Sequence, residues 1–386
     1  MIANKLNMFV VSKAVQASET AAPIDIGQRR RTMSKTCSIA ISAAVVCAAT
    51  HACLRPVRSN EINKQQPAPV FHIRNRSVEP LLRADKPWEE YCVAGGTVIR
   101  EGNRWRMWYG AYDRNYRRDD DACLCYAESP DGLHWTKPDL GLVDYQGTKH
   151  TNILISGRQV GGFAFSYAFL DEGKDAREKY KMIWQRFKPQ DAWWVYGGTS
   201  SDGIRWTLLP KPLSPRNSDT TTPCIPDGGK YRLYTRVWQG GDFRGARAVG
   251  YTESDHFGDF PDPVEIFSHD DHDPEGMQFY SNAATKLADR LYVMFPAAFY
   301  TKNQTVRSHL AWSRDGVHFS RYGREPVVDL GTKFDAKGVY VGPGAVPGDA
   351  PNTWWFYYLG TNVEHDSKPA LTNSDNGIGR FLLVVE

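Results

Sequence analysis

Apolar and polar residues alternate along most of the chain after residue 85, and no long stretch has the spacing of an amphipathic helix. A period of two is typical of β-strands, because successive side chains point to opposite faces of a sheet. One short polar patch, residues 172–179, is helix-like, and we interpret it as a loop. The pattern therefore predicts an all-β structure.

The expected strands recur in similar units. A strand rich in aromatic residues comes first in each unit, and a strand of smaller residues follows it. The aromatic strand occurs five times, at residues 105–109, 180–184, 231–235, 291–295 and 354–358. Repeats about 50 to 75 residues apart, each with several short strands, are typical of β-propellers.

A turn motif follows the strands in several units. It reads Ser-x-Asp-Gly, with an aromatic residue three positions after the glycine. Three full copies lie at residues 129–135, 200–206 and 313–319, and a degenerate copy lies at 253–257. Asp-Gly between strands is a strong hairpin signal, since glycine accepts the positive φ that the turn requires. We expect the aromatic side chain to pack each hairpin onto its neighbour.

These repeats predict a five-bladed β-propeller with four antiparallel strands per blade. The expected blades are residues 90–144, 152–213, 219–268, 277–330 and 338–386. The last strand, residues 379–385, would complete a blade and close the ring. A β-sandwich is the alternative all-β fold, but it does not account for five similar units.

The N-terminal part of the chain has a different character. Residues 1–53 are interpreted as an extension with a signal segment, residues 54–84 as a linker, and residues 85–386 as the propeller. The apolar run at residues 38–50 follows three arginines and is too short to span a bilayer, as in secretory signals. We therefore expect an exported protein that is periplasmic, extracellular or lipid-anchored, with no stable membrane span. Cys53 is the candidate position for a lipid anchor.

Charge and cysteine content narrow the classes of function. A net charge of +3 over 386 residues does not favour nucleic-acid binding, which needs a concentrated basic face. Cys92, Cys123, Cys125 and Cys224 lie in the predicted propeller, as small buried residues or as one disulfide. No second cysteine pair at zinc-binding spacing accompanies them, so we expect no metal site and no cofactor.

The aromatic Trp-Tyr strand followed by Tyr-Ala-x-Ser-x-Asp-Gly-x-x-Trp, at residues 126–135, resembles a known group of proteins. These are the five-bladed propeller glycoside hydrolases of families 32 and 43, the clan of invertases, levansucrases and arabinanases. The resemblance covers about residues 85–386. It implies a carbohydrate substrate and catalytic carboxylates in the central funnel of the propeller. The chain lacks the Trp-x-Asn-Asp-Pro-Asn and Arg-Asp-Pro segments of those families, so its acids are placed differently or have been lost.

Three carboxylates are candidates for acid/base chemistry, which needs a proton donor and an anion near the anomeric carbon. Glu275 ends a polar segment directly before a strand, and Asp219 precedes a strand and a threonine cluster. Glu90 lies beside Trp88 at the start of the first blade. The plainer interpretations are exposed loop acids for Glu275 and Glu90, and a turn cap for Asp219.

Sugars offer polar edges and apolar faces, so their sites combine aromatic, acidic and basic side chains. The candidates for substrate binding are Glu89, Trp88, Asp171, Arg236, Trp238, Tyr280 and His365. Together these residues predict a secreted glycoside hydrolase that acts on a poly- or oligosaccharide. The alternative is a non-catalytic carbohydrate-binding propeller, and two acids at one pocket would favour the enzyme. A phosphorolytic enzyme would need a cluster of basic residues, and a sialidase-like enzyme would need an arginine triad.

Overall fold

The computed structural model describes residues 67–172, 175–188, 192–367 and 376–386. Their regular secondary structure consists almost entirely of β-strands, so the predicted all-β class is confirmed. The helical segments among them are short: η2 (Pro87–Glu89), α1 (Gly157–Val160) and η3 (Ala176–Glu178). None of the helices in the described ranges has the length and apolar content that a bilayer crossing requires. The predicted signal segment and Cys53 lie outside the described residues.

Four sheets have the predicted make-up of four antiparallel strands. The first contains β3 (Cys92–Glu101), β4 (Arg104–Tyr112), β5 (Cys123–Ser129) and β6 (Ile153–Ser156). The second contains β7 (Ala164–Leu170), β8 (Tyr180–Lys188), β9 (Ala192–Ser200) and β10 (Thr207–Ser214). The third contains β11 (Cys224–Asp227), β12 (Lys230–Trp238), β13 (Arg247–Ser254) and β14 (Val264–Phe267). The fourth contains β16 (Thr285–Ala288), β17 (Leu291–Met294), β20 (Ala311–Ser313) and β21 (Ser320–Arg321).

The remaining strands form one nine-stranded sheet instead of a separate fifth blade of four strands. Its main path is β1 (Phe71–Arg74), β25 (Gly377–Val385), β24 (Thr353–Thr361), β22 (Gly338–Val341), β19 (Thr305–Ser308), β18 (Ala297–Tyr300) and β15 (Met277–Ser281). Two short strands, β2 (Leu82–Arg83) and β23 (Val346–Pro347), pair with β25 and β24. The prediction of five blades with four strands each therefore holds for four sheets, and the remaining strands are joined into one larger sheet.

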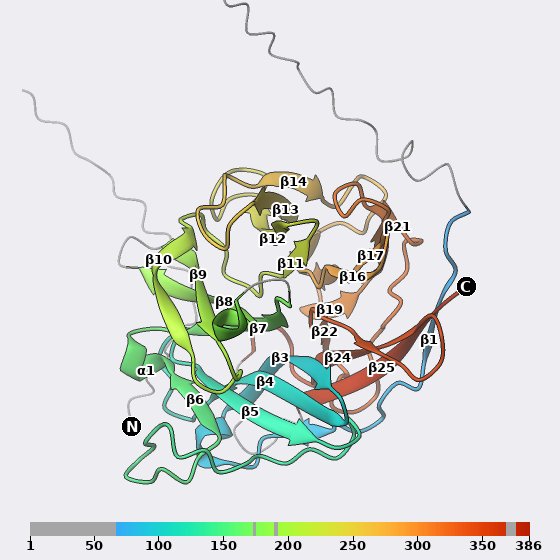
Figure 1. The fold of residues 1–386 in the computed structure, drawn as a ribbon. Helices are drawn as coiled ribbons and strands as arrows, with labels where there is room; N and C mark the ends of the chain where they lie inside the picture. The colour runs from blue at the N-terminus through green and yellow to red at the C-terminus, as the bar shows by residue number, and fades with distance from the viewer. Residues whose placement is uncertain (1–66, 173–174, 189–191, 368–375) are drawn as a thin grey trace, which may run out of the picture. The chain divides into compact units, whose positions relative to one another are not determined.

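The extra strands have a clear origin. In the fourth sheet, the connection from β17 to β20 is itself a hairpin, β18–β19, and its first strand pairs with β15. Strand β19 then meets β22 in parallel at Val306 and Gly338. This pairing joins the hairpin to the sheet of β22, β24, β25 and β1. The sheets lie around a common centre in a propeller-like arrangement, with β3, β7, β11, β16 and β22 toward the middle (Figure 1).

The two ends of the described chain meet in the nine-stranded sheet. β1 pairs with β25 over the full register from Phe71–Val385 to Arg74–Leu382. The final strand therefore completes a sheet as expected, with β1 as its partner. Residues 71–74 and 82–83 were expected to belong to a linker, but they are strands of the folded domain. Their short length and mixed polarity gave no alternation strong enough to reveal them.

The repeated turn motif has one structure in all three full copies. In the first copy, the Ser129 hydroxyl accepts the Gly132 N–H at 2.9 Å. The Asp131 carboxylate accepts the N–H groups of Leu133 and His134 at 2.8 and 2.9 Å. The same bonds recur after Ser200 and after Ser313. Serine and aspartate thus satisfy the backbone donors of the turn, which explains why the motif is repeated.

The glycine carbonyl of each turn binds an aromatic side chain of the neighbouring sheet. Trp108 of the first sheet donates its indole N–H to Gly203 of the second at 2.6 Å. Tyr234 of the third sheet donates to Gly316 of the fourth at 2.7 Å. Tyr357 of the nine-stranded sheet donates to Gly132 of the first at 2.8 Å. The motif therefore joins three pairs of neighbouring sheets.

Gly203→Ala should destabilise the protein more than an ordinary turn substitution does. Gly203 has a φ of +71°, and an added Cβ would lie 2.7 Å from the Trp108 ring. Gly228→Ala is the matched control, because Gly228 has a φ of +60° and open space around it. We expect a loss of about 1 kcal/mol for the control and about 2 kcal/mol more for Gly203→Ala. Urea unfolding measures both, and equal losses would contradict the packing role of the turn.

The four cysteines of the domain are free thiols. Cys125 and Cys224 are fully buried, and burial raises the pKa of both thiols well above the ordinary value. The structure therefore has no disulfide among these four residues, and the interpretation as small buried side chains holds for Cys125 and Cys224, whereas Cys92 and Cys123 are partly exposed.

Candidate functional site

A cavity of about 220 Å³ lies where the inner strands converge. It is lined from several sheets at once, by residues of β3, β7 and β22 and by the segments that precede β11 and β16. The lining residues are Ala94, Gly95, Gly96, Gly110, Tyr112, Ala122, Phe163, Ala164, Phe165, Ser166, Thr220, Thr221, Tyr280, Ser281, Asn282, Tyr340, Val341, Gly342, Pro343, Leu359 and His365. We call this the central cavity.

A buried ion pair stands directly beside the central cavity. Asp219 precedes Thr220 and Thr221, which line the cavity, and its carboxylate pairs with the guanidinium group of Arg236. The Arg236 side chain is 1% exposed and that of Asp219 is 23% exposed. Arg236 also donates through Nε to the backbone oxygen of Tyr280 at 2.9 Å. The buried guanidinium group therefore holds a carboxylate that is partly exposed to solvent.

Buried polar side chains fix the backbone around Asp219. Ser218 and Thr222 share a hydrogen bond of 3.0 Å between their hydroxyl groups. The amide group of Gln185, from β8, donates to the Thr222 hydroxyl at 2.9 Å and also to the Thr220 carbonyl. Such bonds hold a functional side chain in one position.

Three rings form one wall of the central cavity. Tyr280, which ends β15 together with Ser281, lies 4.3 Å from His365, measured between ring centroids. Tyr340 of β22 shares a hydrogen bond of 2.7 Å with His365 Nδ1. The Arg236 guanidinium lies 4.2 Å from the centre of the Tyr280 ring. Aromatic faces beside hydroxyl and imidazole groups suit a ligand with both apolar faces and polar edges.

Further charges surround the same wall. Arg247, from the start of β13, lies 5.4 Å from the centre of the Tyr280 ring and donates to Gln278 at 2.9 Å. Burial and the nearby Arg236 lower the pKa of Arg247, although Asp219 and Asp366 partly offset this effect. Asp366 follows His365 and acts electrostatically on Tyr340 and His365 as well. Two carboxylates, Asp219 and Asp366, therefore influence one cluster of side chains.

Burial controls the ionisation of the rings in this wall. It lowers the pKa of His365 to about 4, so this imidazole is neutral near pH 7. It raises the pKa of Tyr280 and Tyr340, so both phenols keep their protons. The wall consequently offers neutral donors and acceptors, while the charges reside on the arginines and the acids behind it.

Stability should fall on acidification between pH 6.5 and 4. Burial lowers the pKa of His365 and of His309 from 6.5 to about 4, so the unfolded chain binds more protons than the folded one in this range. The stabilising effect is complete above pH 6.5 and is lost as the pH falls toward 4, by at most about 3 kcal/mol per histidine. Urea midpoints across this range measure it. In His365→Phe the fall should be smaller, and an unchanged fall would contradict the assignment.

The structure does not bring Glu275 or Glu90 to the central cavity. The Glu275 side chain is 86% exposed and pairs with Lys302 at 2.6 Å on the surface. Glu90 pairs with Arg114 at 2.6 Å, and its side chain is 38% exposed. For both residues the plainer interpretation, an acid in an exposed loop, describes the observed position. A positive φ of 81° at Gly276 turns the chain between Glu275 and β15.

Trp88 and Glu89 are buried inside the first sheet and do not line the cavity. Trp88 donates its indole N–H to the Asn152 side chain at 3.0 Å and belongs to the hydrophobic core. The Glu89 carboxylate is fully buried, accepts the Tyr109 hydroxyl and pairs with Lys137, each at 2.6 Å. Both side chains serve the packing of the domain, which corrects their expected role in substrate binding.

Asp171 and Trp238 lie on different sides of the site. Asp171 follows the end of β7 that is distant from the cavity-lining Ala164, and it pairs with Lys181 at 3.7 Å and with the Tyr231 hydroxyl. It is a buried structural acid, so its expected binding role is corrected. Trp238 ends β12, lies 5.8 Å from the Arg236 guanidinium and contacts Phe243 at 4.7 Å. Trp238 is not among the residues that line the central cavity, so its role in substrate binding stays a prediction.

Of the predicted residues, the structure brings Asp219, Arg236, Tyr280 and His365 together. Sequence reasoning missed Tyr340, Arg247 and Asp366. Tyr340 and Asp366 neighbour segments that the strand pattern placed at the funnel, so position alone could have suggested them. Arg247 begins an ordinary small-residue strand, and no local signal distinguished it.

Solved structures with the same fold are carbohydrate-related proteins. An N-acetylgalactosamine deacetylase from F. plautii, in complex with blood group B trisaccharide, matches with a TM-score of 0.59 and 16% identity over 81% of this chain and 95% of that one. A glycosyl hydrolase from Bacteroides ovatus matches with a TM-score of 0.53 and 16% identity over 81% and 94%. A structure from the GH130 family of mannoside phosphorylases, which contains glycoside hydrolases that target β-1,2 mannosidic linkages in Candida mannan, matches with a TM-score of 0.52 and 15% identity over 82% and 94%. At these identities the likeness shows the fold alone.

The sequence comparisons cover a smaller part of the chain than the structural comparisons do. Uncharacterized protein Rv1502 of Mycobacterium tuberculosis is 30% identical over 172 residues, which are 41% of this chain and 51% of that protein. Uncharacterized protein MT1551 of the same species is 27% identical over 171 residues. The chain thus spans about half the length of the curated relatives that it matches. No protein-family model matches the sequence.

Proposed function

We propose that the protein is a glycosidase that binds a saccharide in the central cavity and cleaves it with Asp219. One observation carries the proposal: a partly exposed carboxylate, fixed by a buried arginine, adjoins a cavity walled by Tyr280, Tyr340 and His365. The saccharide-related proteins of the same fold support the substrate class.

Asp219 is the anion of the proposed reaction. Glycoside cleavage passes through an oxocarbenium-like state, which a nearby carboxylate stabilises or attacks. The guanidinium group of Arg236 pairs with the Asp219 carboxylate and restricts its movement. A carboxylate held in advance of the reaction pays no reorganisation cost when positive charge develops at the anomeric carbon.

Asp366 is the second carboxyl group of the proposal. It acts electrostatically on the same side chains as Asp219, namely Arg247 and His365. A glycosidase needs a proton donor for the leaving oxygen in addition to an anion, and a carboxyl group in this position supplies one. The Tyr280 ring offers a face for stacking against the sugar.

A non-catalytic sugar-binding propeller is the second candidate. The observation that favours it is the composition of the central cavity, whose described lining contains no carboxylate. Under this alternative, Asp219 would serve only to fix Arg236.

The experiment that separates the two is a release assay with parallel binding measurements. The full chain is incubated with a panel of oligosaccharides and aryl glycosides, and reducing ends are measured beside affinity by calorimetry. Release from at least one substrate supports the glycosidase. Binding without release supports the second candidate, and neither binding nor release would contradict both.

Two further proposals concern the fifth blade and the location of the protein. We propose that β22, β24, β25 and β1 act as the fifth blade, because they pair in this order as four antiparallel strands, as the strands of the other four sheets do. We also propose export, from the signal-like segment at residues 38–50. N-terminal sequencing of the secreted protein would test the second point.

A further inference from the structure

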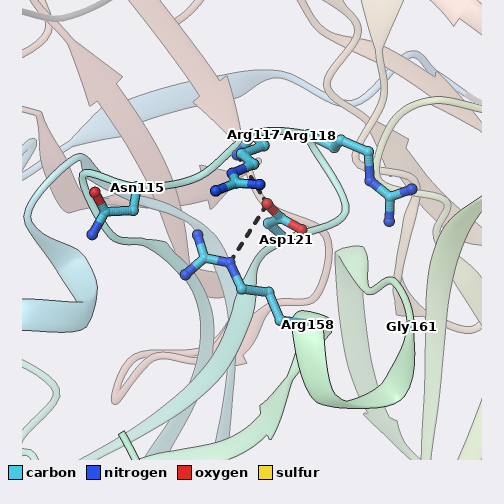
Figure 2. A pocket seen from close by; sticks show the side chains of 7 residues that line it. Asn115, Arg117, Arg118, Asp121, Arg158 and Gly161 are labelled. Atoms are coloured by element: carbon cyan, nitrogen blue, oxygen red, sulfur yellow. Dashed lines mark hydrogen bonds and ion pairs between the residues drawn. The ribbon is translucent and has the colours of Figure 1, made fainter. Parts of the chain in front are cut away.

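A second pocket, of about 430 Å³, lies between the loop that joins β4 to β5 and the turn that contains α1 (Figure 2). Guanidinium groups dominate its side chains. The lining residues are Asn115, Arg117, Arg118, Asp121, Gly157, Arg158 and Gly161. We call this the arginine pocket.

The arginine pocket adjoins the central cavity through a shared wall. Asp121 forms a β-bridge with Phe163, and the Phe163 N–H donates to the Asp120 carbonyl at 2.7 Å. Ala122 and Phe163 line the central cavity, whereas Asp121 and Gly161 line the arginine pocket. Neighbouring residues of the same two segments therefore line the two spaces.

Two of the arginines are matched by acids. Arg158 binds both oxygens of Asp113 at 2.7 and 2.9 Å, and its Nε lies 3.5 Å from Asp121. Arg118 lies 3.0 Å from the buried Asp120. Burial raises the pKa of Asp120 despite that neighbour.

Two other guanidinium groups lack an acidic partner within the described ranges. Arg117 holds Asp121 through its backbone N–H, at 2.9 Å, which leaves its side chain available. Figure 2 shows Arg117 and Arg158 on either side of Asp121. Arg186 is half-buried, and its Nη2 would lie 3.0 Å from a Cβ on Gly161. No ion pair of the described chain involves either side chain.

A half-buried arginine without a counter-charge costs free energy, because part of its hydration is lost. A solvated surface cluster would explain Arg117, but it does not explain the burial of Arg186 at the edge of the same pocket. An oxyanion removes that cost, since the planar guanidinium group binds carboxylate and sulfate through paired hydrogen bonds.

We infer that the arginine pocket binds an acidic substituent, a carboxylate or sulfate group, of a saccharide whose adjoining sugar occupies the central cavity. The inference rests on the proposed function and specifies its substrate class as acidic oligo- or polysaccharides. Arg117 and Arg186 supply the charges that meet the substituent, and Arg158 holds the loop in place through Asp113.

Calorimetric titration of the full chain tests the inference with uronate-containing, sulfated and neutral oligosaccharides of equal length. We expect the acidic ligands of one or both classes to bind at least tenfold more tightly than the neutral ligand, with an affinity that falls as salt rises. Arg117→Gln and Arg186→Gln should each weaken acidic binding about tenfold and leave neutral binding unchanged. Arg104→Gln is the matched control, because this exposed arginine begins β4 at the end away from the pocket.

The outcomes separate this inference from the proposed function. Equal affinity for acidic and neutral ligands would overturn the inference, and so would an equal loss of affinity for both kinds of ligand in Arg117→Gln. Release of neutral sugar would in either case still support the glycosidase. Arginine-dependent binding of acidic ligands without release would support the inference and contradict cleavage. Arginine-dependent binding of inorganic phosphate alone, with faster release in its presence, would overturn the inference in favour of a free-phosphate site.

Discussion

Asp219→Asn is expected to lower saccharide release by about a thousandfold or more, while saccharide binding persists. The amide keeps the shape of the side chain and can still accept a hydrogen bond from Arg236. It cannot provide the negative charge that the oxocarbenium-like state requires. In kinetic terms, kcat should fall and KM should change little, because the lost interaction belongs to the transition state.

Glu275→Gln is the matched control for this experiment. It makes the same chemical change at an 86% exposed carboxylate whose partner, Lys302, is also on the surface. We expect its release rate to equal that of the original chain. Circular dichroism and a urea midpoint establish that Asp219→Asn is folded. A folded Asp219→Asn protein with unimpaired release would remove Asp219 from the mechanism.

Arg236→Met should destabilise the protein by about 3 kcal/mol. Arg236 is almost fully buried, and its loss leaves the Asp219 carboxylate and the Tyr280 carbonyl without their partner. The partial exposure of Asp219 keeps the expected loss at the lower end for a broken buried pair. Urea unfolding measures the change in the free energy of unfolding.

Arg216→Met provides the comparison for Arg236→Met. Its pair with Asp262 has a similar separation, 2.5 Å, but both side chains are exposed. Exposed pairs contribute little, so the midpoint of this variant should stay close to that of the original chain. Equal effects of the two substitutions would show that Arg236 does not organise the site.

Local signals in the sequence explain how much of the fold was predictable. The Ser-x-Asp-Gly turn satisfies its own backbone donors, so its meaning is contained within about six residues. Its repetition predicted the four-stranded sheets at nearly their observed positions along the chain. The β18–β19 hairpin was missed because the strand signal at residues 291–295 gave no indication that a further hairpin follows it. The pairing of Val306 with Gly338 joins residues far apart in the chain, and no local pattern predicts it.

The site was predictable only where strand position determined it. Arg236 and Tyr280 lie near the ends of their strands, at the ends that border the central cavity. Their positions along the strands were therefore enough to predict them. Glu89 also lies near a strand, but Lys137, which is 48 residues later, holds it in the core. Glu275 seemed well placed by its distance from β15, yet the turn at Gly276 directs it to the surface. Long-range partners and single turns of this kind carry no local signal.

The most direct test of the account is a crystal structure of Asp219→Asn with an oligosaccharide that the protein binds. If the proposed function is correct, we expect a sugar ring in the central cavity against Tyr280, with its anomeric carbon beside residue 219. A saccharide bound on another face of the domain, with the central cavity unoccupied, would contradict it.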